Sequence, residues 1–63
     1  MWSITVPGVR LPEGFTLWED PGERQLHHRS TVVAVWHVTG ETAPTPQEIQ
    51  RTIGEFLSEA QKA

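Results

Sequence analysis

The segment TVVAVWHV, from Thr31 to Val38, is apolar or β-branched at every position except His37. Successive side chains of a strand point to opposite faces, so this segment predicts a strand with two apolar faces. One face carries Val32, Ala34, Trp36 and Val38, and the other carries Val33, Val35 and His37. The chain has 63 residues, and its sequence predicts one helix. One helix can cover only one face of a small sheet. The second face therefore needs another cover.

Two further strands are expected before this segment. Trp2–Val6 (WSITV) alternates apolar and polar residues, which predicts a half-buried strand. Pro7–Gly14 contains two prolines and two glycines and predicts a loop, which we expect Val9 and Leu11 to anchor to the core. Phe15–Glu19 predicts the second strand.

The third strand is the least defined by the sequence. Asp20–Glu23 (DPGE) suits a type II turn, because proline favours the second position and glycine the third. The residues after it include no glycine, proline or asparagine to reverse the chain, so we expect one long, bulged strand over about Arg24 to Thr39. Two strands with a turn near Arg29-Ser30 are the alternative.

The C-terminal segment predicts a helix. Thr45 is a candidate N-cap, Pro46 fits the first helical position, and Glu48 lies where a capping box requires it. The apolar residues then recur at helical spacing at Ile49, Ile53, Phe56, Leu57 and Ala60. We therefore expect an α+β fold, a small antiparallel β-meander of three or four strands with one C-terminal α-helix packed on one face. Residues 1–63 would form a single β-β-β-α domain.

Composition narrows the class of protein. The chain has no cysteine, five Lys and Arg, eight Asp and Glu, and a net charge of −3. The basic residues are scattered, which disfavours nucleic-acid binding. No apolar segment approaches the length of a membrane span, and MWSITVPG does not follow the pattern of a secretory signal. We expect a soluble cytoplasmic protein that does not bind membranes. A short, acidic, cysteine-free chain would also suit a bacteriophage-encoded protein.

No arrangement typical of catalysis is present. The serines lie in no nucleophile motif, and no glycine-rich loop has the spacing of a phosphate site. The only histidines are His27, His28 and His37, and their spacing is not that of a metal site. We therefore expect no enzymatic activity, no cofactor and no metal, with a site built from these histidines and a carboxylate as the alternative.

The last third of the chain, VTGETAPTPQEIQRTIGEFLSEA, resembles the end of the HicB-type antitoxin fold. In both, a strand leads through a turn into a helix that begins with a P-x-E pattern. The signature of the type P-D-L-P-G-C that precedes it in that family is absent here. The resemblance therefore implies no function.

The second apolar face of Thr31–Val38 indicates a small protein-binding module. Such a module would be an oligomer subunit, an accessory component of an assembly or a stoichiometric inhibitor, with another copy or a larger protein as its partner. The expected contact residues are Trp18, Val32, Ala34, Trp36 and Val38, with His28 and Arg29 at the rim.

Two alternatives remain open. The Pro7–Gly14 loop could fold beneath the strand and close a barrel-like core, which would leave no free apolar face. Trp2, Trp18 and Trp36 could instead stack the bases of single-stranded nucleic acid, although the net negative charge disfavours this.

Overall fold

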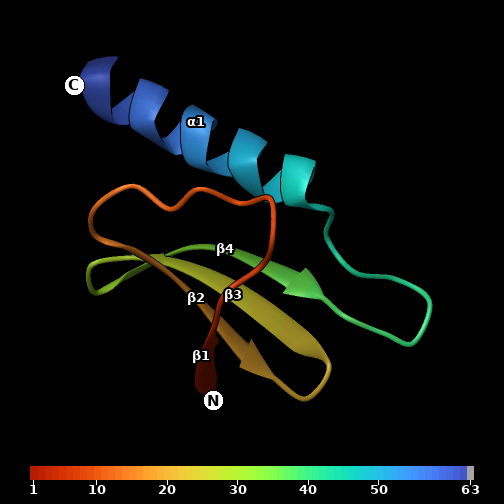
Figure 1. Ribbon diagram of the computed structural model, residues 1–63. Helices are drawn as coiled ribbons and strands as arrows, with labels where there is room; N and C mark the ends of the chain where they lie inside the picture. The colour runs from red at the N-terminus through yellow and green to blue at the C-terminus, as the bar shows by residue number, and fades with distance from the viewer. Residues whose placement is uncertain (63) are drawn as a thin grey trace.

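A computed structural model describes residues 1–62 as a four-stranded antiparallel sheet with one helix on one face (Figure 1). The elements are β1 (Trp2–Ile4), β2 (Phe15–Asp20), β3 (Glu23–His28), β4 (Thr31–His37) and α1 (Pro46–Lys62). The strand order is β1-β2-β3-β4, so each strand pairs with its neighbour in the chain. This confirms the α+β meander with a C-terminal helix, with four strands.

The β2–β3 connection forms as the sequence predicts. Asp20 pairs with Glu23, which leaves Pro21 and Gly22 as the two central residues of the turn. Gly22 has a φ of 80°, the positive value that the third position of a type II turn requires.

The expectation of one long strand over Arg24 to Thr39 is wrong. The chain reverses at Arg29-Ser30, and His28 pairs with Thr31 across this two-residue loop. Arg29 makes the reversal with a φ of 58°, a left-handed conformation that arginine rarely adopts. Its backbone N–H donates to the Gly14 carbonyl at 2.8 Å. The position with positive φ carries Arg29 and not the glycine, asparagine or aspartate that favours such a turn, so the sequence contained no clear local signal for it.

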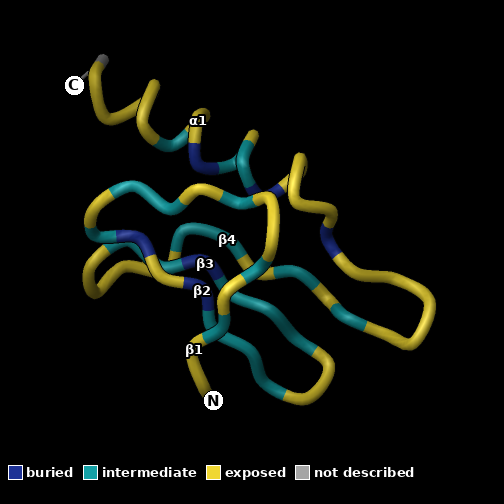
Figure 2. The backbone as a smooth tube through the Cα atoms, in the orientation of Figure 1, coloured by how far each residue is buried: buried dark blue, intermediate teal, exposed yellow. Residues whose placement is uncertain are grey.

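The helix begins at the predicted residue. The Thr45 hydroxyl oxygen accepts a hydrogen bond from the Glu48 N–H at 3.1 Å, which caps the first turn before Pro46. Ile49 and Ile53 are fully buried and Phe56 is half-buried, whereas Leu57 and Ala60 are exposed. The apolar stripe therefore packs only over the first part of α1, and Figure 2 shows its last turns exposed.

The core lies between the sheet and α1. Phe15, Leu17 and Leu26 from the sheet are buried together with Ile49 and Ile53 from the helix. None of the described helices is both long enough and apolar enough to cross a membrane.

The β1–β2 loop lies on the same side of the sheet as α1. Its residues Val9 and Leu11 pack against the core, as expected. The Gln50 side-chain amide accepts a hydrogen bond from the Arg10 N–H at 2.8 Å and donates one to the Arg10 carbonyl at 3.0 Å. The loop therefore covers one flank of the helix, and the alternative in which it closes a barrel beneath the sheet is wrong.

Candidate functional site

β4 is an edge strand. Among residues 1–62, β3 is the only strand that pairs with it. Natural proteins usually protect such an edge with charged residues, with proline or with a β-bulge, and of these β4 has only a bulge. Thr31–His37 contains no Lys, Arg, Asp, Glu or Pro, so β4 presents an uncharged edge with backbone groups available to another strand.

A β-bulge decides which side chains of β4 face the helix. Leu26 of β3 pairs with Ala34, but the next residue of β3, His27, pairs with Val32, so Val33 is the extra residue. Val33 and Ala34 both pack against the core as a result. The strict alternation that the sequence suggested is therefore broken inside β4.

The face of the sheet away from α1 carries the exposed valines. Val32 and Val35 are 51% and 50% exposed, and they lie opposite His27 and Gln25 of β3. Together with the free edge, they form an apolar strip along β4.

Polar groups beside this strip bond to one another. The Gln25 side-chain N–H donates to the Glu23 carboxylate at 2.6 Å. The Gln25 Oε1 atom lies 2.8 Å from the Nε2 atom of His27. The Trp18 indole N–H donates to the Thr16 hydroxyl at 2.9 Å. Because these groups already have partners, a molecule that covered this face would leave few of them without a hydrogen bond.

The helix side of β4 borders a groove. It has a volume of about 220 Å³, is open to solvent, and is lined by Val33 of β4 with Thr52, Glu55, Phe56 and Glu59 of α1. The Thr52 hydroxyl donates to the Glu48 carbonyl at 2.9 Å, and the lining also includes the side chains of Glu55 and Glu59. The groove has an apolar floor, Val33 and Phe56, and an acidic rim.

The groove lies on the flank of α1 that the loop does not cover. Successive residues of a helix are rotated by about 100°. This rotation places Gln50 and Thr52 on opposite flanks of the buried residue Ile53. Gln50 bonds to the loop, whereas Thr52 lines the groove. We call the strip, the free backbone edge and the groove the β4 edge surface. Its residues are Val32, Val33, Val35, Thr52, Glu55, Phe56 and Glu59.

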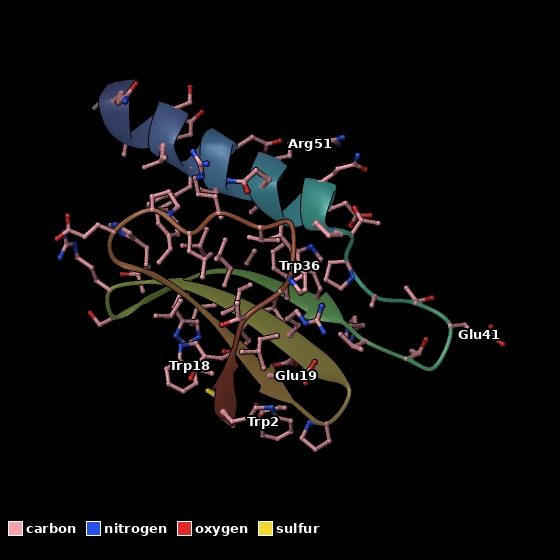
Figure 3. All side chains as sticks on the ribbon, in the orientation of Figure 1. Trp2, Trp18, Glu19, Trp36, Glu41 and Arg51 are labelled. Atoms are coloured by element: carbon pink, nitrogen blue, oxygen red, sulfur yellow. The ribbon has the colours of Figure 1, made fainter. Side chains whose placement is uncertain are left out.

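The seven predicted contact residues do not form one surface. Trp36 and Ala34 pack against the core on the helix side, while Trp18 and Val32 lie on the opposite face, and Figure 3 shows Trp18 and Trp36 on opposite sides of the sheet. The assumption that Val32 shares a face with Ala34 and Trp36 is wrong, because the bulge separates them.

The remaining three predicted residues are also dispersed. Val38 follows β4 and is half-buried, with its N–H donating to the Gly22 carbonyl at 3.0 Å. His28 lies on the helix side, with ring centroids 4.7 Å from Phe15 and 5.0 Å from Phe56. Arg29 is exposed in the hairpin turn. Of the predicted set, Val32 alone belongs to the β4 edge surface.

The histidines of the metal alternative are not brought together. His27 lies on the outer face within 5.9 Å of the Trp18 ring, His28 lies on the opposite face, and His37 pairs with Glu23 at the other end of β3. Within residues 1–62, no group of three His, Asp or Glu side chains is arranged to hold a metal ion.

The tryptophans do not form a platform for stacking bases. Trp36 packs against the core and Trp18 lies on the outer face. Trp2 is half exposed on β1, opposite Glu19. The geometry therefore gives the nucleic-acid alternative no support.

Sequence reasoning missed the helix residues of the β4 edge surface. Thr52, Glu55 and Glu59 recur at helical spacing beside the apolar stripe, where polar residues ordinarily indicate a solvated face. Only the topology, with β4 at the edge and the loop on the other flank, shows that they border a groove.

Comparisons with protein-family models, with curated proteins and with solved structures found no match to this chain.

Proposed function

We propose that this chain is a small non-enzymatic protein-binding module that receives an extended segment of a partner protein along the free edge of β4. The observation that carries this proposal is the position of the most apolar strand of the chain at the edge of the sheet, with no charged side chain to protect it.

The two sides of the edge support this mode of binding. When an extended segment joins a sheet edge, backbone hydrogen bonds supply affinity, and pockets for alternate side chains supply specificity. Here the outer side offers Val32 and Val35, and the helix side offers the groove beside Val33. A module of this kind would serve as an accessory component of an assembly or as a stoichiometric inhibitor.

Affinity capture with a pair of edge variants tests the proposal. Val35→Lys places a charge on the exposed side of β4, where it opposes the addition of another strand. Ser3→Lys is the matched control, because Ser3 is exposed on the same face of β1, at the opposite edge. Circular dichroism would establish that both variants fold.

The expected result is selective loss of binding. Proteins captured from a cell extract by the immobilised chain, quantified by mass spectrometry, should disappear with Val35→Lys and persist with Ser3→Lys. Equal capture by all three proteins, or equal loss with both variants, would contradict binding at the β4 edge.

A further inference from the structure

We infer that the segment received at the β4 edge is basic, and that it places a lysine or arginine side chain in the groove between β4 and α1. This inference rests on the proposed function, because it concerns the occupant of the same edge. It follows from the position, shape and charge of the groove.

The position follows from sheet geometry. A strand added to β4 would lie about 4.8 Å beyond it, and every second side chain would face the helix. Those side chains would stand next to Val33, under the flank of α1 that carries Thr52, Glu55 and Glu59. One side chain of the added segment would therefore enter the groove.

The shape and polarity of the groove match a long cationic side chain. Its floor is apolar, through Val33 and Phe56, and its rim carries the exposed carboxylate of Glu55. Lysine and arginine bury an aliphatic stem against apolar surface while the charged end remains at the polar rim. An aspartate or glutamate would instead meet the Glu55 carboxylate, a charge of its own sign, at a cost to binding.

A second copy of this chain does not supply such a side chain. Its own β4 contains neither lysine nor arginine, and Arg29 lies in the turn outside the strand. The net charge of −3 also opposes association of two copies more than it opposes a basic partner. We therefore assign the edge to a segment of a different protein.

Three synthetic peptides test the inference with the intact chain. Each has nine residues of alternating Thr and Val with blocked ends, and the central residue is Arg, Gln or Glu. Binding is followed by NMR titration of the ¹⁵N-labelled protein. We expect the Arg peptide to bind about tenfold more tightly than the Gln peptide. The Glu peptide should bind more weakly than either. The changes in amide chemical shift should centre on β4 and the groove.

Two variants with the same change in net charge assign the preference to the groove. Glu55→Gln removes a rim carboxylate, and we expect it to abolish most of the preference for Arg over Gln. Glu41→Gln removes a carboxylate from the exposed connector between β4 and α1, which does not line the groove, and should leave the preference intact. Equal effects of the two variants would mean that only the overall charge matters, which would overturn the inference.

The other outcomes separate this inference from the proposed function. Equal affinity for the three peptides, with shifts on β4, would overturn the basic partner and leave strand addition standing. No binding of any peptide, with a dimer in analytical ultracentrifugation that Val35→Lys dissociates, would identify a second copy as the occupant and overturn this inference alone. Neither peptide binding nor association would overturn both.

Discussion

Val33 is the residue at which the two faces of β4 diverge from a simple alternating pattern. As the extra residue of the bulge, it packs against the core next to Ala34. This places Trp36 on the helix side and leaves Val32 and Val35 on the outer face. The excess of apolar residues in TVVAVWHV is thus divided between a core, a groove and an exposed strip.

Arg29 carries the strain of the β3–β4 turn, and its replacement should relieve it. Arg29 has a φ of 58°, whereas its neighbour Ser30 has no positive φ. The left-handed conformation costs an ordinary residue about 1–2 kcal/mol, a cost that glycine does not have. Glycine also gives the unfolded chain more freedom, which lowers stability by about 0.5–1 kcal/mol. We expect Arg29→Gly to raise the free energy of unfolding by up to about 1.5 kcal/mol in urea denaturation.

The neighbouring position provides the matched control for this turn. Ser30→Gly adds the same unfolded-state freedom without relieving a positive φ, so it should lower the free energy of unfolding by about 0.5–1 kcal/mol. If Arg29→Gly destabilised the chain as much as Ser30→Gly does, Arg29 would not hold the strained conformation.

Among the elements, α1 begins where the local sequence predicts, and its buried residues then hold it against the sheet. Thr45, Pro46 and Glu48 set the start of α1, and Ile49 and Ile53 follow at the spacing that buries them. The Glu48 N–H bond to the Thr45 hydroxyl and the Ile49 N–H bond to the Thr45 carbonyl both join the connector to the helix.

Removal of this cap should lower stability in proportion to one lost hydrogen bond. Thr45→Ala leaves the Glu48 N–H without its side-chain acceptor, and we expect the free energy of unfolding to fall by about 1 kcal/mol. Thr45→Ser keeps the hydroxyl and should change it little. Chemical denaturation of both variants checks this, and equal stability of Thr45→Ala and the parent chain would show that the cap contributes nothing.

The contrast between α1 and the β3–β4 hairpin shows what sequence could predict. The helix and the Pro21-Gly22 turn depend on residues with strong local preferences, so their positions were predictable. The turn at Arg29-Ser30 and the bulge at Val33 have no such signal, because tertiary pairing imposes them. The predicted contact set failed to form one surface for the same reason, since its members were grouped by strict alternation along one strand.

At the scale of the whole molecule, the two flanks of α1 differ. The β1–β2 loop occupies one flank through Arg10 and Gln50, and the groove beside β4 opens on the other. The opposite edge strand, β1, has only three residues, whereas β4 has seven. The described part of the molecule therefore has one long edge strand without Lys, Arg, Asp or Glu and, beside it, one groove lined in part by Glu55 and Glu59.

Amide hydrogen exchange of β4, residue by residue, would examine this edge in the free chain and in the chain saturated with the Arg peptide. Alternate residues of an edge strand direct their N–H groups towards the sheet and away from it. In the free chain we expect the inward amides to exchange slowly and the outward amides to exchange as fast as those of exposed loops. The bound peptide should slow the outward amides. Outward amides already protected in the free chain, or still fast with the peptide bound, would contradict this expectation.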